Sequence, residues 1–194
     1  MKHAVIVAHP KVVSFTMAVA RAYETGASGR GHGVVLRDLY RMNFAPCLEA
    51  GEMAAAGRFS PGRDVIEERR LLADAQVFVF VYPFWLYAQP AMLKGYIDRV
   101  FGMGFAYGSG RGGNAPLLSG RKMLSFTSSG APTEWMRGTG NWDAATQLFD
   151  KYFAAVCGLE VVDHVHFGGI VPGIRGDVVE SHLAKVRDAV ARHF

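Results

Sequence analysis

The sequence is poor in cysteine, with only two among its 194 residues. Cys47 and Cys157 lie 110 positions apart, and no C-x-x-C pair or Cys/His cluster has the spacing of zinc ligands. A disulfide framework and a zinc centre are therefore excluded, and we predict no metal site. Free thiols are typical of a reducing compartment, so we expect the protein to be cytoplasmic.

Long apolar stretches and concentrated charge are also lacking. The first apolar run stops at His9 and Pro10, too early for a secretory signal. The most apolar segment, residues 77–93, is interrupted by Pro83, Gln89 and Pro90, and is too short to span a bilayer. Lys and Arg total 21 against 17 Asp and Glu, and the net charge of +4 is scattered along the chain. A nucleic-acid partner is therefore not expected.

The sequence does contain enough apolar material for one domain covering residues 1–194, because half of its residues are hydrophobic. A chain of this length buries roughly 70% of its unfolded surface. Continuous apolar runs at residues 3–8 and 77–82 are typical of strands buried on both faces. We predict further strands at 34–36, 122–127 and 159–165, and helices at 15–25, 64–73, 91–101, 143–156 and 178–192.

This alternation predicts an α/β fold, in which a five-stranded parallel sheet is covered by helices on both sides. In a sheet of order 2-1-3-4-5, ligands bind where the strand order reverses, outside the C-terminal ends of strands 1, 3 and 4. The segments that follow those strands are residues 9–16, 83–90 and 127–130. These three segments are therefore the candidate binding site.

The first segment leaves strand 1 and enters a helix, with Ser14 in the position of an N-cap. Free backbone N–H groups and the positive end of the helix dipole favour an anion at such a point. His9 and the hydroxyls of Ser14 and Thr16 provide further hydrogen bonds for phosphate oxygens. On residue types alone, a Ser14 that only caps the helix is the more common case, and phosphate binding is the alternative.

The second segment places Phe84, Trp85, Leu86 and Tyr87 directly after a buried strand, where small polar residues are usual. Large aromatic groups at the ligand edge of a sheet favour a flat apolar partner such as an isoalloxazine ring. A hydrophobic plug or a dimer interface would have the same composition, so those alternatives stay open.

The third segment combines Thr127, Ser128, Ser129 and Gly130, whose small side chains let a ligand approach the backbone. Their hydroxyl and N–H groups suit the N1/C2 carbonyl side of a flavin, where negative charge develops on reduction. An ordinary polar turn is the competing interpretation.

Other possible motifs are not taken as functional sites, because the predicted elements around them do not fit. The G-x-G-x-x-G match at residues 108–113 follows a helix, so we expect a flexible loop there. No P-loop or G-x-S-x-G elbow is present. His164 and His166 alternate on a predicted strand and are expected to be surface or edge histidines. Asp98 and Arg99 are expected at a solvated or ion-paired helix end.

Taken together, the segments resemble a known family. The matching motifs are H-P-x3-S-F at 9–15, D-L-Y-x-M-N-F at 38–44, P-A-M-L-K-G-Y-I-D-R-V-F at 90–101, A-Y at 106–107, P-L-L-S-G-R-K at 116–122 and T-S-S-G at 127–130. In order and spacing they resemble the NAD(P)H:quinone oxidoreductase family of flavodoxin-like flavoproteins, which includes ancillary subunits of potassium efflux systems.

The resemblance implies a flavodoxin-like three-layer sandwich and a homodimer, with FAD, or FMN as the alternative, at the subunit interface. The phosphate arm would be held by His9, Ser14, Phe15 and Thr16. Carried over in the same way, Pro83, Phe84, Trp85 and Leu86 would line the isoalloxazine, and Thr127, Ser128, Ser129 and Gly130 would reach its pyrimidine edge.

Catalytic positions also follow from the resemblance. Tyr107 would contact the quinone or nicotinamide from the opposite subunit, and the backbone at Gly130 would stabilise the charge of the reduced ring. Trp135 and Asn141 stand where animal relatives carry a tyrosine and a histidine that relay charge. A histidine relay at those positions is therefore missing.

The implied reaction is ping-pong hydride transfer from NADH or NADPH through flavin N5 to a quinone. An ancillary regulatory subunit of a membrane potassium efflux system, with a transporter as partner, is one alternative. Azo or nitro reduction is another. A one-electron carrier is disfavoured, because its T-x-T-x-N-T loop and acidic surface are absent.

Overall fold

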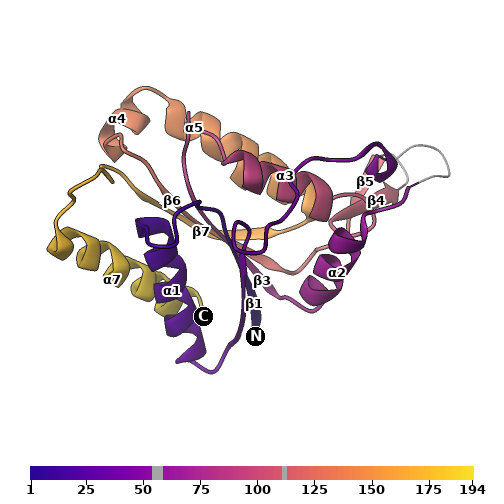
Figure 1. Cartoon of the computed structure of the whole chain (residues 1–194), viewed down its shortest axis with the longest axis horizontal. Helices are drawn as coiled ribbons and strands as arrows, with labels where there is room; N and C mark the ends of the chain where they lie inside the picture. The colour runs from indigo at the N-terminus through magenta and orange to yellow at the C-terminus, as the bar shows by residue number, and fades with distance from the viewer. Residues whose placement is uncertain (54–58, 111–112) are drawn as a thin grey trace.

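A five-stranded parallel sheet forms the centre of the molecule, with the order β2-β1-β3-β6-β7 (Figure 1). The computed structural model describes residues 1–53, 59–110 and 113–194. Counted along the chain, the five strands have the predicted order 2-1-3-4-5, which is confirmed. Their bounds are Lys2–Val7 for β1, Gly33–Asp38 for β2, Val77–Pro83 for β3, Lys122–Ser128 for β6 and Glu160–Phe167 for β7.

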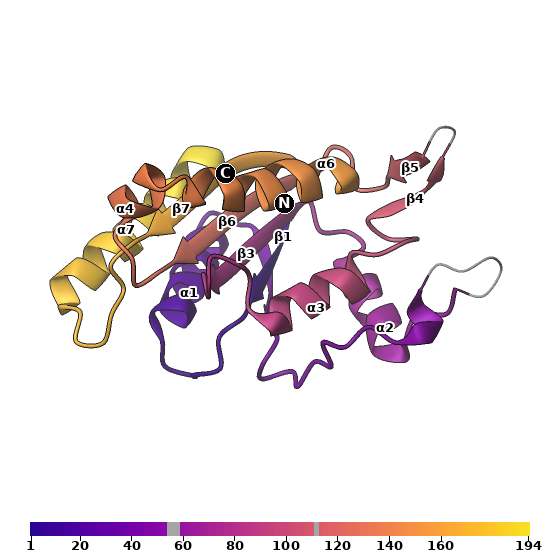
Figure 2. The ribbon, with the colours of Figure 1, turned by 90° about the horizontal axis from the view of Figure 1, so that it is seen from above.

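Helices cover both faces of this sheet (Figures 1 and 2). Helices α1 (Phe15–Ser28) and α7 (Gly176–His193) contact each other on one face. The other face carries α2, α3 and a continuous helical segment made of α5, η2 and α6. The remaining bounds are Ala50–Glu52 for η1, Arg63–Leu72 for α2, Ala91–Val100 for α3, Thr133–Gly138 for α4, Asn141–Thr146 for α5, Gln147–Phe153 for η2 and Ala154–Cys157 for α6.

Burial on both faces explains why the central strands have no polar alternation. All seven residues of β3 are buried. Successive residues of β1 point to opposite cores: Ala4 and Ile6 pack under α3 and η2, whereas Val5 and Val7 pack under α1 and α7. The prediction of a parallel sheet from the apolar runs is therefore confirmed.

The short helices η1 and α4 were not predicted, and two further segments differ from the sequence prediction, of which the first is a hairpin. Strands β4 (Tyr107–Gly110) and β5 (Gly113–Pro116) pair antiparallel where we predicted a loop. That prediction was wrong because it relied on residue types, and glycine-rich segments have little strand propensity. The two strands are instead held by hydrogen bonds between their backbones. Residues 111–112 of the G-x-G-x-x-G match lie outside the described residues.

The second difference is a π-helical segment. The helix predicted at 143–156 is divided into α5, the π-helix η2 and α6. Phe149 and Phe153 of η2 stack with ring centroids 4.9 Å apart and an interplanar angle of 4°. Asp150 of the same segment has only 11% of its side chain exposed. The segment thus turns both aromatic groups and a carboxylate toward the sheet.

The end of α3 is ion-paired, with Asp98 solvated and Arg99 buried. Lys94 pairs with Asp98 at the surface, whereas the side chain of Arg99 is 3% exposed and pairs with Glu52 and Asp64. Arg99 also donates to the backbone oxygen of Ala45 at 2.6 Å. This guanidinium therefore ties Ala45, Glu52 and Asp64 to α3.

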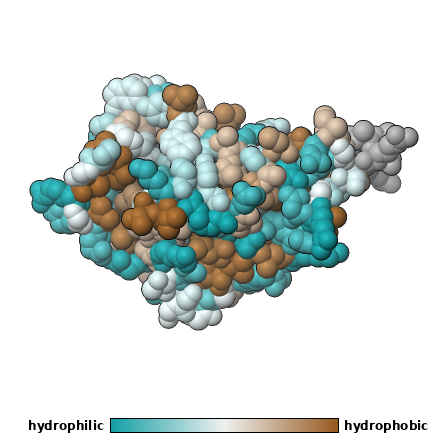
Figure 3. All heavy atoms as spheres, viewed as in Figure 1, coloured by the Kyte–Doolittle hydropathy of each residue, from teal (hydrophilic) through white to brown (hydrophobic). Residues whose placement is uncertain are grey.

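The surface retains apolar patches between hydrophilic ones, as Figure 3 shows for one face. Val13, Leu86, Leu148 and Tyr152 are among the large apolar residues left exposed. Among the described residues, no helix combines the length and apolar character needed to cross a membrane.

Candidate functional site

A cavity of about 430 Å³ lies at the C-terminal edge of β1, β3 and β6. Its volume falls within the ~300–1,000 Å³ range of small-molecule sites. All the predicted cofactor-binding residues except Leu86 and Thr127 line it. The lining residues are His9, Lys11, Val13, Ser14, Phe15, Thr16, Pro83, Phe84, Trp85, Ser128, Ser129, Gly130, Ile170, Val171, Pro172, Gly173 and Ile174.

The N-terminus of α1 forms one end of the cavity. Ser14 is its N-cap, and its hydroxyl accepts a hydrogen bond from the N–H of Met17 at 3.2 Å. The N–H of Ala18 donates to the backbone oxygen of Ser14 at 3.0 Å. The N–H groups of Phe15 and Thr16, at the first turn, have no carbonyl four residues before them within the helix. They and the helix dipole leave this end of the cavity suited to an anion.

His9 lies beside this end of the cavity, in a loop whose backbone is held by hydrogen bonds from Arg41. Its Nδ1 accepts a hydrogen bond from the N–H of Lys11 at 3.1 Å. The guanidinium of Arg41 donates to the backbone oxygens of His9 and Pro10, at 2.9 and 2.7 Å. Burial, with smaller contributions from the charges of Lys11 and Arg41, lowers the pKa of His9. The neutral ring therefore carries its proton on Nε2, which remains a hydrogen-bond donor.

The aromatic wall comes from the segment after β3. Phe84 is buried, whereas Trp85 is 44% exposed, and the two lie with Pro83 on the cavity. Trp85 and Ala88 exchange two backbone hydrogen bonds of 3.1 Å, which closes a tight turn. Its central residues, Leu86 and Tyr87, have φ of 51° and 60°. Positive φ at both central positions is unusual for side chains of this size, and such strain is often found at functional sites.

Leu86 points out of the cavity, because its side chain is 99% exposed. Tyr87 stacks on Trp135, with ring centroids 5.9 Å apart and an interplanar angle of 28°. Trp135 itself is 51% exposed. Asn141 donates from its amide to the Thr139 hydroxyl at 2.8 Å and does not line the cavity.

The polar wall comes from the end of β6. Ser128, Ser129 and Gly130 line the cavity, but Thr127 is 1% exposed and lies behind it. The Thr127 hydroxyl is within hydrogen-bond distance of two imidazoles, at 2.8 Å from His164 Nε2 and 2.9 Å from His166 Nδ1. These histidines lie on the edge strand β7, which agrees with the prediction of surface or edge histidines. Their ring nitrogens nevertheless face Thr127, because β7 pairs with β6 in a register that sets Thr127 opposite His166.

Sequence reasoning missed residues 170–174, which complete the cavity opposite the aromatic wall. They follow β7 and are held by backbone bonds such as that from the N–H of Ile170 to the oxygen of Ser129, at 2.9 Å. A signal was available, because this Gly- and Pro-containing segment also leaves the C-terminal end of a strand in the same sheet.

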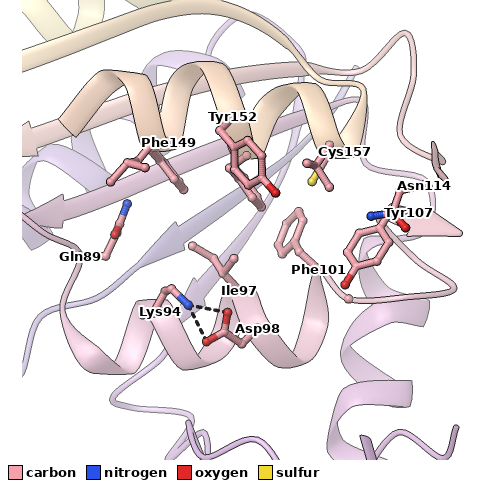
Figure 4. Close-up of a pocket in the computed structure, with 14 residues that line it drawn as sticks. Gln89, Lys94, Ile97, Asp98, Phe101, Tyr107, Asn114, Phe149, Tyr152 and Cys157 are labelled. Carbon is pink, nitrogen blue, oxygen red and sulfur yellow. Dashed lines mark hydrogen bonds and ion pairs between the residues drawn. The ribbon is translucent and has the colours of Figure 1, made fainter. Parts of the chain in front are cut away.

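Tyr107 lies elsewhere in the chain. It lines a second cavity of about 430 Å³ between α3, η2 and the β4–β5 hairpin (Figure 4). Phe101, Phe149, Tyr152 and Cys157 also line this cavity. The structure therefore does not bring Tyr107 together with the first cavity within one chain.

The donor set of the first cavity fits a flavin. An anion-binding helix end, an aromatic wall and a row of hydroxyl and N–H groups occur side by side, and they match phosphate, tricyclic ring and pyrimidine edge respectively. No group of three or more His, Cys, Asp or Glu side chains suited to a metal ion occurs among the described residues.

The sheet order defines an open α/β protein, and its first cavity lies at the C-terminal edge of the strands, where such folds bind ligands. The sequence model of the family described as having a flavodoxin-like fold matches residues 1–193, so the chain belongs to that family.

Similar proteins agree with this assignment. The chain is 40% identical over 191 residues to the uncharacterized NAD(P)H oxidoreductase YcaK of Escherichia coli (strain K12), covering 94% of this chain and 93% of that one. It is 34% identical over 171 residues to an uncharacterized NAD(P)H oxidoreductase of Haemophilus influenzae, covering 88% and 85%. Among solved structures, the NAD(P)H:quinone oxidoreductase from Methanothermobacter marburgensis superposes with a TM-score of 0.87 at 30% identity, covering 100% of this chain and 98% of that one.

Proposed function

We propose that this protein is an NAD(P)H:quinone oxidoreductase that binds a flavin in the first cavity. The observation that carries the proposal is the meeting of the α1 N-terminus, the Phe84–Trp85 wall and the Ser128–Gly130 turn around one space. The activities named for the similar proteins, NAD(P)H oxidoreductase and NAD(P)H:quinone oxidoreductase, support it.

The cofactor is proposed to be FAD, with FMN as the alternative. Its phosphate arm lies at the start of α1, where His9, Ser14, Phe15 and Thr16 offer hydrogen bonds. The ring lies against Pro83, Phe84 and Trp85, with Leu86 at its outer rim. The hydroxyl and N–H groups of Ser128, Ser129 and Gly130 meet its pyrimidine edge, with Thr127 behind them.

Bound flavin supplies two-electron chemistry, with NADH or NADPH as donor and a quinone as acceptor. The protein's own residues orient the planar rings and balance the negative charge that the reduced ring gains. The Phe84 and Trp85 side chains hold a planar group by stacking and keep water from one side of it. The N–H of Gly130 is the dipole that stabilises the negative charge of the reduced ring. No dedicated acid and base at the reacting carbon is required.

A homodimer completes the site in this proposal. Tyr107 is remote from the first cavity in its own chain, so it reaches a substrate only from a second copy. The exposed apolar side chains of Leu148 and Tyr152 at the second cavity are the surface on which that copy would pack. Both cysteines are free, which supports a cytoplasmic location.

The test is to purify the protein, identify any released yellow cofactor by mass, and measure menadione reduction with NADH and with NADPH. Trp85→Ala removes the exposed part of the aromatic wall and is expected to weaken flavin binding at least tenfold. Ile66→Ala, at an exposed position of α2 that lines neither cavity, is the control and should bind flavin normally. A colourless protein that neither FAD nor FMN reconstitutes would defeat the proposal.

A further inference from the structure

The inward-facing histidines of β7 belong to a continuous chain of side chains. Each neighbouring pair of polar atoms in it is within 3.0 Å. The chain runs from Asp150 Oδ2 to His164 Nδ1 (2.6 Å), from His164 Nε2 to Thr127 Oγ1 (2.8 Å), from Thr127 Oγ1 to His166 Nδ1 (2.9 Å) and from His166 Nε2 to Ser129 Oγ (3.0 Å). Its first member is on the π-helix η2, and its last member lines the first cavity.

Every link of this chain is satisfied when both imidazoles are neutral. His164 then donates its Nδ1–H to the carboxylate of Asp150 and accepts the Thr127 hydroxyl proton on Nε2. Thr127 accepts from Nδ1–H of His166, whose Nε2 accepts the proton of Ser129. Each group thus donates in one direction only, toward Asp150.

Every link is also satisfied after one proton is added at Ser129. All the hydrogen bonds beyond His164 then reverse: His164 donates from Nε2 to Thr127, Thr127 donates to Nδ1 of His166, and His166 donates from Nε2 to Ser129. The proton of Ser129 needs a new acceptor, and the backbone oxygen of Ala131 lies 3.0 Å from its Oγ. The added charge ends as an imidazolium at His164 beside the Asp150 carboxylate. The same atoms therefore serve two protonation states without a broken hydrogen bond.

The surroundings favour His164 as the place where the proton is held. Oδ1 of Asp150 is buried and has no hydrogen-bond partner among the described residues, so the carboxylate is short of positive neighbours. Burial, together with the charges of His164 and Arg137, lowers the pKa of His166 to about 4. His166 therefore passes a proton on and does not keep it.

Few other charged or titratable groups face the chain. Arg137 of α4 lies over the Trp142 ring at 5.6 Å, and that ring is 4.8 Å from His164 and 5.6 Å from His166. The Tyr82 hydroxyl of β3 is near Asp150, and burial raises the pKa of that tyrosine well above its usual range. The remaining neighbour, Phe84, stacks on His166 with centroids 5.5 Å apart and forms part of the cavity wall.

From this geometry we infer that the chain is a one-proton store, which opens on the cavity at Ser129 and offsets negative charge gained by a ring bound there. The inference rests on the proposed function, because it takes that ring to be the flavin. It assigns His164 and Asp150 as positioning residues that act through Thr127, His166 and Ser129, in place of the relay missing at Trp135 and Asn141.

The step balances as a transfer of one proton. A hydride from the nicotinamide donor, which carries two electrons and one proton, enters the ring, and one further proton from the solvent enters at Ser129 and is held by His164. When the hydride passes to a quinone, the stored proton leaves through Ser129 and completes the hydroquinone, so NAD(P)H, one proton and the quinone give NAD(P)⁺ and the hydroquinone. No oxidant or reductant beyond those of the proposed reaction is needed.

The first experiment examines the protein without flavin. Imidazole ¹⁵N resonances are followed against pH in the wild type, and the proton of His166 is expected to move from Nδ1 to Nε2 as His164 becomes protonated. Thr127→Val keeps the shape but removes the linking hydroxyl, so the two histidines should titrate independently. Thr127→Ser should restore the coupling. Ser125→Ala removes a buried hydroxyl of the same strand that has no hydrogen-bond partner within the described part of the chain, and it should change nothing.

The second experiment measures the midpoint potential of bound flavin against pH. The wild type is expected to take up one more proton per two electrons than His164→Gln or Thr127→Val near neutral pH. His193→Gln is the control and should behave as the wild type, because His193 pairs with Asp163 and neither residue belongs to the hydrogen-bonded series from Asp150 to Ser129.

The outcomes separate the two proposals. Equal proton uptake in the wild type and both chain variants, or a His166 tautomer that ignores His164, would overturn the proton store while leaving the flavoenzyme intact. A protein that cannot bind flavin would defeat the proposed function and this inference together.

Discussion

Arg99 and Glu52 form a two-point ion pair inside the protein, with Nε to Oε2 at 2.8 Å and Nη2 to Oε1 at 2.9 Å. Their side chains are only 3% and 4% exposed. The pair joins α3, which lines the second cavity, to the segment before α2. Arg99 also pairs with Asp64, but Glu52 has no second salt-bridge partner among the described residues, so its carboxylate is left buried without a paired cation once Arg99 is removed.

Replacing Arg99 should therefore be costly. Arg99→Met keeps much of the side-chain volume but leaves the Glu52 carboxylate buried without its cation, and a loss of ~3–5 kcal/mol in the free energy of unfolding is expected. Urea denaturation measures this. Lys94→Met is the matched control on the same helix, because its partner Asp98 is 41% exposed and the pair should contribute only ~0–1 kcal/mol. Equal losses in the two variants would contradict the argument.

The same pair predicts a stability change in acid. Hydrogen bonds from Arg99, aided by the N–H groups of Glu49 and Gly62, lower the pKa of Glu52 from 4.5 to about 2 against the opposing effect of burial. Its contribution is therefore complete above about pH 4.5 and is lost as the pH falls toward 2. A shift of this size corresponds to ~3 kcal/mol.

Denaturation across this pH range tests the assignment. The free energy of unfolding of Glu52→Gln should fall less steeply between pH 5 and pH 2 than that of the wild type, although the variant is less stable at neutral pH. Glu67→Gln, at a position 59% exposed, should keep the wild-type slope. A slope unchanged by Glu52→Gln would show that other carboxyl groups dominate acid unfolding.

Replacing Leu86 with glycine should make the protein more stable. Its side chain is 99% exposed and its φ is 51°, so the side chain gains little from burial and the backbone is strained. Relief of that strain, ~1–2 kcal/mol, is partly offset by the freedom that glycine gains in the unfolded chain, ~0.4–1 kcal/mol. Leu86→Gly should raise the free energy of unfolding of the flavin-free protein by up to ~1 kcal/mol.

Leu117→Gly is the control for Leu86→Gly. Leu117 is 48% exposed and is not among the positive-φ residues, so its replacement should destabilise the protein. A second measurement follows from the proposed position of Leu86 at the ring's outer rim: flavin should bind Leu86→Gly more weakly than the wild type. If Leu86→Gly lost as much stability as Leu117→Gly, the strain argument would be wrong.

Tyr107→Phe should keep its flavin and lose part of its quinone turnover, because only a hydroxyl that contacts the substrate is removed. Tyr152→Phe, at a tyrosine of the same cavity, should retain full turnover (Figure 4). Steady-state menadione reduction and flavin fluorescence titration check both variants. Complete loss of flavin in Tyr107→Phe would argue against its placement in the substrate pocket.

The sheet and three walls of the site could be predicted because their signals are local. Unbroken apolar runs mark strands covered on both faces, and the residues after them must lie at one edge of a parallel sheet. The buried state of His164 and His166 could not be predicted in this way. It depends on a register shift between Met123 and Leu124 that sets Thr127 opposite His166, and on a carboxylate from η2.

Other parts of the site could not be predicted, because they depend on tertiary contacts that residue types do not reveal. Ser14 was correctly placed as a helix cap, but nothing in its neighbourhood distinguished a hydroxyl on the cavity from one behind it, as with Thr127. The hairpin β4–β5 is stabilised by backbone pairing of a glycine-rich sequence, which has no hydrophobic pattern to read. Residues 170–174 were missed because no aromatic or hydroxyl residues mark them.

Because η2 is a π-helix, the contact between Asp150 and His164 depends on the number of residues in this helical segment. A wide helical turn holds one residue more than an α-turn of the same rise, and deleting a single residue from 147–153 would let the segment rewind. Each deleted position rotates the residues before it by about 100° relative to those after it. The carboxylate would then face away from β7 even though no residue type at the site had changed, so insertions and deletions are the changes to which this site is most sensitive.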